Sequence, residues 1–582
     1  MLGAAEAAGT PIASWAPLVS VLVGFGVIVA CLYAFGRSGE AGSRAARVFL
    51  RSPRRMELVT GIPGWAASTI GIALYGLFVA GQGFYSDVAW HVAYGRDKEL
   101  FNAPHTSIVV GLGLILLSGG IGILTASLEG VEVGWRWRNV QAPRSCVALV
   151  ALGGGAVAGF PIDTIWHAAY GVDVTMWSPP HMLMILGASF TGIAAWLVLA
   201  EAGVSPHDGW WAGGFHVVTA WLTLQGLAAP LGEFSFGVPQ FQHLLHPLLL
   251  CIASGFAFVA IRLAIGRGYA LAIAVVNFAI SGNLFGGGGG DGGPVDTRSV
   301  GVFVASAVAV EAAAVLLGTR LPVRFAIAAG VGVGTVGLAG EWWWNTDAYQ
   351  PWQTSMLPDA AILSTIAAVG AAIVGAAFGR TLDRSSPTPP LHGRLVAAAA
   401  AAVVVAVAIP MPRHVGDVTA TVRLIDHADG QARIQVAVTP PDAADHARWF
   451  QAGAWQGGGL VIADLERTPD GSYLTDRPVP IAGDWKTLVR LHRGGQLMTV
   501  PVHLPADPKI DKPEIPAVER TQPMEAETAY LLRETRPGGG AVKWLVYASL
   551  FASLALWALA LTLTTTHTPM MRSATGRALT PS

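Results

Sequence analysis

Runs of apolar residues long enough to cross a bilayer recur along most of this chain, and they restrict it to a membrane fold. A spanning helix needs about 20 predominantly apolar residues, and within the hydrocarbon layer only helices and closed barrels satisfy all their backbone hydrogen bonds. The composition agrees, because 53% of the 582 residues are hydrophobic and 13% are charged, against roughly 25% charged in soluble domains. We expect thirteen spans, near residues 15–36, 61–83, 106–127, 145–163, 181–201, 211–231, 244–264, 268–286, 299–318, 325–341, 360–379, 394–410 and 542–566.

One region outside these spans has a different pattern. Between residues 411 and 505, segments of alternating polar and apolar residues, such as VTATVRLI and ARIQVAV, are separated by turn sequences such as TPDGS. This pattern is typical of a small antiparallel β-sandwich. The predicted fold class is therefore an all-α polytopic membrane bundle, built partly from repeated helical hairpins, with a β-sandwich before the last helix. The expected parts are a helical domain at 1–410, the β-sandwich at 411–505, a Pro-rich tether with a short helix at 506–541, the last span at 542–566 and a tail at 567–582.

Positive charge alternates between the connections of the expected spans and predicts their orientation. The arginine-rich connections are 37–58, 128–144, 262–267, 319–324 and 380–394. Because such loops stay in the cytoplasm, we expect a multi-pass protein of the cytoplasmic (inner) membrane. Its N-terminus and residues 411–541 would lie outside, and its C-terminus inside. The net charge of −1 gives no field that would attract nucleic acid, so the lipid bilayer is the expected surrounding.

Two stretches, 84–111 and 160–187, repeat one polar pattern between apolar runs and match at 11 of 28 positions. Ionisable residues at membrane depth are costly and usually functional. An Asp-x3-His pair lies on one face of a helix end, and a second histidine begins the following helix. The repeat therefore predicts two sets of three metal ligands, Asp87, His91 and His105 in the first, and Asp163, His167 and His181 in the second. Asp97 and Asp173 are further carboxylates that could hold the second ring nitrogens.

Two weaker copies occur in other connections on the same predicted side. The stretch 340–359 places Glu341, Asn345 and Asp359 at the spacing of the ligands above, and we regard them as weaker candidates. A shortened copy, GEFSFGVPQFQHLLHP, offers Glu233, His243 and His246 as possible additional ligands. The histidines of the predicted β-sandwich, His492 among them, have no ligand spacing and are interpreted as surface residues.

Imidazole and carboxylate ligands together suit copper, iron or zinc. The three cysteines are dispersed in apolar runs, which argues against a disulfide framework or a cysteine-based zinc site. The alternative is that these aspartates and histidines cap helices, pair with each other or line a hydrated vestibule without any ion.

The twice-repeated Asp-x3-His-x13-His pattern, at Asp87, His91, His105 and at Asp163, His167, His181, resembles the copper-binding C subunit of particulate methane and ammonia monooxygenases. The expected number of spans and the weaker copies depart from that subunit. The segment GSYLTDRPVPIAGDWKTLVRLHRGG (471–495) resembles FixH/YtkA-like domains, which handle copper in oxidase assembly. The run FQHLLHPLLL is similar to the histidine-bearing helix of CtaG-type oxidase assembly factors. All three resemblances imply copper outside the cytoplasmic membrane.

Three functions follow as hypotheses. The first is a copper-dependent, monooxygenase-like oxidoreductase that acts at the outer face of the membrane on a small apolar substrate. The second is a copper uptake, delivery or oxidase-assembly protein without catalysis. The third is a scaffold in which the polar cluster only organises helix packing. The first two imply partner membrane subunits or redox and copper-handling proteins.

Overall fold

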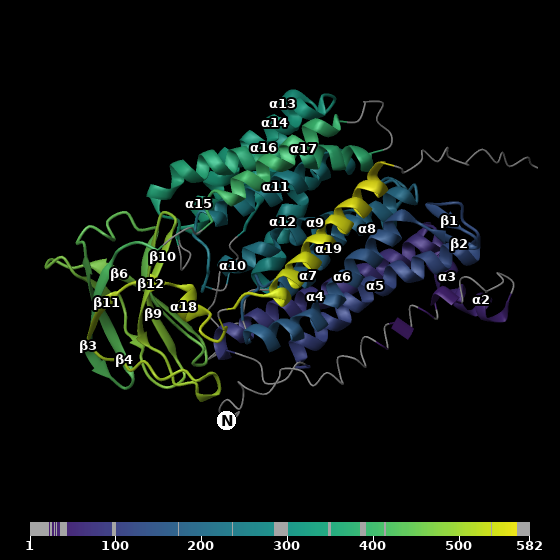
Figure 1. Ribbon diagram of the computed structural model, residues 1–582. Helices are drawn as coiled ribbons and strands as arrows, with labels where there is room; N and C mark the ends of the chain where they lie inside the picture. Colours follow the sequence, from purple (N-terminus) through teal and green to yellow (C-terminus); the bar gives the residue numbers. More distant parts are fainter. Residues whose placement is uncertain are drawn as a thin grey trace, which may run out of the picture.

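The computed structural model describes residues 43–95, 101–172, 174–235, 237–284, 301–346, 351–383, 391–411, 415–536 and 538–566, with seven further positions between 23 and 34. A bundle of long helices forms most of the molecule, and an antiparallel sheet domain lies at one end of it (Figure 1). The helices are α2 (Arg44–Phe49), α3 (Arg51–Thr60), α4 (Gly64–Tyr94), α5 (Ala103–Glu129), α6 (Arg144–Tyr170), α7 (Pro179–Ser189), α8 (Thr191–Glu201), α9 (Trp210–Ala228), α10 (Gly232–Ser235), α11 (Leu245–Ala264), α12 (Tyr269–Leu284), α13 (Val304–Leu317), α14 (Pro322–Gly332), α15 (Leu338–Asn345), α16 (Leu357–Leu382), α17 (Gly393–Ala408), α18 (Thr528–Leu531) and α19 (Ala541–Thr566).

Eight helices within the described residues are long and apolar enough to cross a membrane, so a multi-pass membrane protein is supported and the count of thirteen spans is not confirmed. Three further apolar helices, from α12, α13 and α17, are shorter than a bilayer requires. The span predicted at 15–36 lies mostly outside the described residues, as does the tail at 567–582. The span predicted at 181–201 is one continuous stretch, in which α7 and α8 meet at Phe190.

Small residues let the helices of the repeated hairpins approach each other closely. A Cβ added to Gly111 of α5 would lie 2.4 Å from the backbone nitrogen of Ala80 in α4. Between α5 and α6 the same holds for Gly153, where an added Cβ would lie 2.4 Å from the nitrogen of Leu116. Such contacts stabilise membrane helix pairs because van der Waals packing replaces the hydrophobic effect inside lipid. They hold the ends of α4, α5 and α6 in a fixed relation, which positions the polar residues there.

The sheet domain confirms the predicted antiparallel β region. Its ten strands form one continuous, barrel-like sheet in the order β11-β3-β4-β7-β6-β5-β9-β10-β12, with β8 paired to β4. The strands are β3 (Thr419–Ala428), β4 (Gln431–Thr439), β5 (Trp449–Trp455), β6 (Leu460–Arg467), β7 (Tyr473–Thr475), β8 (Val479–Pro480), β9 (Lys486–Arg493), β10 (Gln496–His503), β11 (Arg520–Pro523) and β12 (Glu525–Ala526). Alternate residues of β3 and β4, such as Val422, Ile434 and Val436, point into its core. The stretch predicted as a tether contributes β11 and β12, so part of it belongs to the sheet.

The sheet domain lies directly on the ends of the two repeated hairpins. The backbone N–H of Gln456 donates to the carbonyl of Val92 at 3.0 Å, and that of Gly458 to the carbonyl of Ala93 at 2.9 Å. Next to the second hairpin, the N–H of Arg536 donates to the carbonyl of Tyr170 at 2.6 Å. Both repeats and the sheet domain are therefore at the same end of the bundle. A short hairpin, β1 (Trp135–Trp137) and β2 (Val140–Ala142), joins the opposite ends of α5 and α6.

Candidate metal centre

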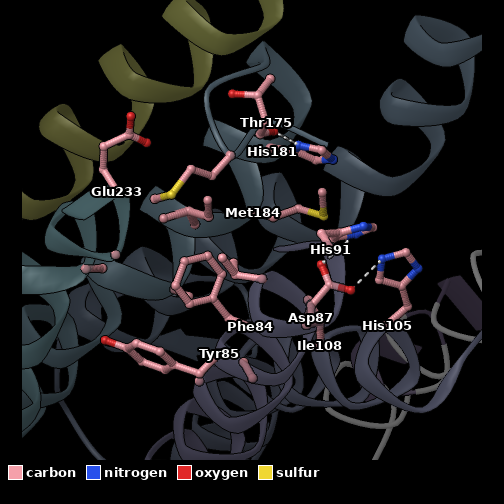
Figure 2. Close-up of a pocket in the computed structure, with 18 of the residues that line it drawn as sticks. Phe84, Tyr85, Asp87, His91, His105, Ile108, Thr175, His181, Met184 and Glu233 are labelled. Carbon is pink, nitrogen blue, oxygen red and sulfur yellow. Dashed lines mark hydrogen bonds and ion pairs between the residues drawn. The ribbon is translucent and has the colours of Figure 1, made fainter. Parts of the chain in front are cut away.

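The first repeat brings one carboxylate between two imidazoles. Asp87 and His91 lie in the last two turns of α4, and His105 lies in the first turn of α5, where Asn102 caps the helix by accepting from the His105 N–H at 2.7 Å. Asp87 Oδ2 is 3.5 Å from His91 Nε2, and Asp87 Oδ1 is 3.1 Å from His105 Nε2. Figure 2 shows the carboxylate directed at both rings.

The second repeat reproduces this arrangement, with its carboxylate and first imidazole more deeply buried. Asp163 and His167 end α6, and His181 lies in the first turn of α7. Asp163 Oδ1 is 3.4 Å from His167 Nε2 and 3.5 Å from His181 Nε2. The side chains of Asp163 and His167 are 10% exposed, against 16–17% for Asp87 and His91. Asp163 Oδ1 and His167 Nε2 are buried, yet neither makes a hydrogen bond of ordinary geometry with any described residue.

Backbone carbonyls orient one imidazole of each group. His91 Nδ1 lies 2.9 Å from the carbonyl oxygen of Gly95. His181 Nδ1 lies 2.5 Å from the carbonyl oxygen of Thr175, a contact that Figure 2 shows. A neutral ring that donates from Nδ1 has its lone pair on Nε2, and both Nε2 atoms face a carboxylate oxygen. A proton or a metal ion on each Nε2 atom would be stabilised by the facing carboxylate oxygen. A carbonyl partner on the far nitrogen is also the usual environment of metal-bound histidine.

Both groups satisfy the elementary requirements of a metal site. In each, one ligand atom from every member lies within 4.8 Å of the others, and among the described residues these are the two groups of at least three such side chains. Two histidines and one carboxylate suit non-haem iron, copper or zinc, and leave coordination positions open for a further ligand. The donor set therefore fits a transition metal, without selecting one.

One cavity of about 260 Å³ joins the two groups. All six candidate ligands line it, and apolar side chains such as Phe84, Ile108 and Met184 form much of the remaining wall (Figure 2). Trp455 and Leu531 of the sheet domain complete the wall. The chamber is thus polar where the six candidate ligands meet it and mainly apolar elsewhere.

The additional candidates of the shortened copy do not join either group. Glu233 lines the same cavity, but Trp177 Nε1 donates to its Oε2 at 2.6 Å and the N–H of Gln240 donates to Oε1. Burial raises the pKa of Glu233 to about 7, although these hydrogen bonds act to lower it. Figure 2 shows Glu233 on a different wall from Asp87.

His243 and His246 lie behind that wall rather than on it. His246 Nδ1 accepts from Trp352 Nε1 at 2.9 Å, and both rings stack with Phe234. Burial holds the pKa of His243 well below its ordinary value. His243 and His246 are therefore packed among aromatic rings, and no third ligand completes a metal group with them among the described residues.

The copy at residues 340–359, called the third copy, has the predicted spacing, but its polar side chains do not face one another. Glu341 accepts from the N–H groups of Val302 and Phe303, so its carboxylate supports the backbone before α13. Asn345 Nδ2 donates to the carbonyl of Glu341 at 2.8 Å, and Asp359 pairs with Arg448 at 2.8 Å. These three side chains form no metal group. Asp97 and Asp173, predicted to support the ligands, lie outside the described residues.

The sequence did not indicate a buried ionic cluster in the sheet domain. The interpretation of the sheet-domain histidines as surface residues is wrong for His492 and His503. His492 is fully buried and its Nε2 lies 2.7 Å from Glu527 Oε1, and His503 is 4% exposed. Arg490 donates to both oxygens of Glu527, at 2.8 and 2.9 Å. Burial alone would raise the pKa of Glu527, but Arg490 and His492 lower it to about 2. Distant residues meet here only in the folded sheet, so no local sequence pattern could reveal the cluster.

No protein-family model, curated protein sequence or solved structure matches this chain. The chemistry of the two groups is therefore argued from their own atoms.

Proposed function

We propose that this chain is a membrane oxidoreductase that binds copper in the two Asp-His-His groups and acts on a small apolar substrate. The observation that carries the proposal is the shared cavity: both ligand groups open into one chamber whose other walls are mainly apolar. A pure packing role would give no reason for such a chamber beside Asp163 Oδ1 and His167 Nε2, two buried atoms that make no hydrogen bond with the described residues. When bound, a redox metal with open coordination positions would supply the chemistry needed to activate O2.

The residues of the chain would do the binding and orienting. Through their carbonyl groups, Gly95 and Thr175 would orient the rings of His91 and His181 so that the two Nε2 atoms could bind an ion. Phe84, Ile108 and Met184 would bind the apolar substrate and exclude water. We further infer from the positive-inside rule that the cavity lies at the outer face of the cytoplasmic membrane. The resemblance to monooxygenase C subunits suggests partner membrane subunits.

Metal analysis of the purified full-length protein tests this proposal. Wild type should contain two copper ions per chain, and a variant with His167→Ala and His181→Ala should contain one. His427→Ala with His446→Ala is the matched control, because both residues are exposed in the sheet domain, and it should retain both ions. Equal copper, iron and zinc content in wild type and the His167/His181 variant would refute metal binding at the second group.

A copper carrier is the second candidate, because one observation favours ion exchange. The side chains of Asp87, His91 and His105 keep 16–17% exposure and that of His181 keeps 22%, so a chelator or partner protein could reach an ion in either group. O2-dependent turnover of small hydrocarbons or ammonia by the copper-loaded protein would establish the enzyme. Absence of turnover, together with rapid copper transfer to a soluble chelator, would establish the carrier.

A further inference from the structure

We propose that Gln456 of the sheet domain is a positioning residue for the first Asp-His-His group, acting through the end of α4. The inference rests on the proposed metal binding at Asp87, His91 and His105. It assigns to the sheet domain a role in the metal site, beyond closing the cavity.

The turn between β5 and β6, residues 456–459, binds the last carbonyl groups of α4. Gln456 Nε2 donates to the carbonyl of His91 at 3.3 Å, its backbone N–H donates to that of Val92, and the N–H of Gly458 donates to that of Ala93. The last carbonyls of a helix, here those of Val92 and Ala93, lack partners within the helix, whereas the carbonyl of His91 also accepts from the Gly95 N–H at 3.1 Å. One turn of the sheet domain thus supplies donors to three successive residues, the first of which is a candidate ligand.

The turn adopts a strained conformation where it meets α4. Gln456 has a φ of 65°, in the left-handed region that costs a residue with a Cβ about 1–2 kcal/mol. The next residue, Gly457, lies so close to the Trp485 ring that an added Cβ would be 2.3 Å from it. Backbone strain of this kind persists only where the surroundings enforce it, and it clusters at functional sites. Here the strained residue is Gln456, whose side-chain amide contacts the hairpin of the first Asp-His-His group.

The contact reaches the ligand through Gly95. This glycine ends α4 with a φ of 79°, and its carbonyl is the acceptor for His91 Nδ1. A Cβ at Gly95 would lie 3.3 Å from the side-chain amide of Gln456, so the amide packs directly on the residue that orients the imidazole. A shift of the turn would move the Gly95 carbonyl and rotate His91 Nε2 away from Asp87.

The second group has a different neighbour, which makes the effect selective. Gly171, the counterpart of Gly95, packs against the backbone of Glu534, and an added Cβ there would lie 2.4 Å from the Glu534 oxygen. His181 is oriented by Thr175, to which the 456–459 turn makes no hydrogen bond among those found in the described residues. Replacing Gln456 should therefore alter the first group and spare the second.

Copper titration of full-length Gln456→Ala, followed by electron paramagnetic resonance of Cu²⁺, tests the proposal. Each group is measured alone in a background that removes the other. The first group is measured in the His167→Ala/His181→Ala variant, and the second in the His91→Ala/His105→Ala variant. Loss of a residue that orients a metal ligand weakens binding about 10–100-fold, and we expect this loss, with an altered spectrum, at the first group alone. Gln435→Ala is the matched control, because Gln435 donates to Ser472 within the sheet domain, and it should change neither group.

Two results of this experiment would overturn the inference. Unchanged affinity and spectrum at the first group would show that Gln456 does not position it, and equal weakening of both groups would show a general effect on folding. If Gln456→Ala does not fold, Gln456→Gly, which suits the positive φ, replaces it with the same criteria. Wild-type protein that binds no copper at all would instead refute the proposed function.

Discussion

The two intact hairpins and the third copy share one spacing and differ in what their polar groups contact. From Asp87 to His105, from Asp163 to His181 and from Glu341 to Asp359, the separation is 18 residues. In the hairpins a carboxylate and two Nε2 atoms face each other at 3.1–3.5 Å. In the third copy the carboxylate of Glu341 is occupied by two backbone N–H groups.

The difference shows that spacing predicts where a polar residue lies but not whether it is available to an ion. Backbone groups and an arginine already satisfy the side chains of Glu341 and Asp359. Asp163 Oδ1 and His167 Nε2 lack such partners among the described residues. A binding site requires ligand atoms that the protein leaves unsatisfied, because a buried polar atom without a partner costs about 1–3 kcal/mol unless a ligand compensates.

The largest expected effect is on stability, in the third copy. Glu341→Ala leaves the buried N–H group of Phe303 and the half-buried N–H group of Val302 without their acceptor, which should lower the free energy of unfolding by about 2–4 kcal/mol. Metal content should not change. Thermal unfolding in detergent, combined with metal analysis, measures both quantities. Loss of metal at unchanged stability would show that Glu341 is a ligand and that the comparison is wrong.

The next effect is on metal affinity, in an intact hairpin. Asp163→Asn keeps the shape of the side chain and removes the charge that binds a cation. Loss of a residue that only supports a metal ligand weakens binding by up to about 100-fold. Because Asp163 would contact the ion itself, we expect the copper affinity of the second group to fall by at least about that factor, or about 2.7 kcal/mol. Copper titration in the His91→Ala/His105→Ala background measures it, and Asp87→Asn there should have no effect. An unchanged affinity would mean that the proton-bridged alternative describes Asp163.

The sequence predicted which polar residues of the two hairpins meet better than it predicted the helices around them. Two copies of an Asp-x3-His motif, each beside a second histidine at a helix start, determine which residues meet, because helix geometry alone brings positions i and i+4 together. The same reasoning did not predict the surroundings of His243 and His246, because their partners Trp352 and Trp449 come from distant segments of the chain. Hydropathy indicated apolar helices but not their lengths, and α12, α13 and α17 are short.

The role of the sheet domain could not be predicted from sequence. Alternation of polar and apolar residues indicated its strands, because only one face of each packs in the core. Nothing in the sequence near Gln456 indicates that its turn binds the end of α4, since that contact joins residues 365 positions apart. The pairing of β11 with β3 was not predicted either, because the proline-rich composition around β11 indicates a tether rather than a strand.

A smaller effect concerns the pH dependence that Glu233 adds. Its pKa is about 7 in the folded protein and 4.5 as the ordinary value, so between these pH values the folded state binds more protons than the unfolded state. The free energy of unfolding should therefore fall as pH rises from 4.5 to 7, by up to about 1.4 kcal/mol per unit. Glu233→Gln should remove this slope. Unfolding measured across that range in both proteins tests it, and a slope retained in the variant would assign the effect to another group.

The smallest expected effect is at Asp359, the last member of the third copy. Its side chain is 58% exposed and pairs with Arg448 at 2.8 Å, and exposed ion pairs contribute about 0–1 kcal/mol because water and salt screen them. Asp359→Ala should therefore change the free energy of unfolding by less than about 1 kcal/mol and leave the metal content intact. The Arg448 side chain is only 11% exposed, which makes the measurement informative. A loss well above 1 kcal/mol that persists in high salt would mean that Asp359 compensates a buried cation. In that case all three polar residues of the third copy, Glu341, Asn345 and Asp359, would stabilise the fold, and none of them would be available to bind an ion.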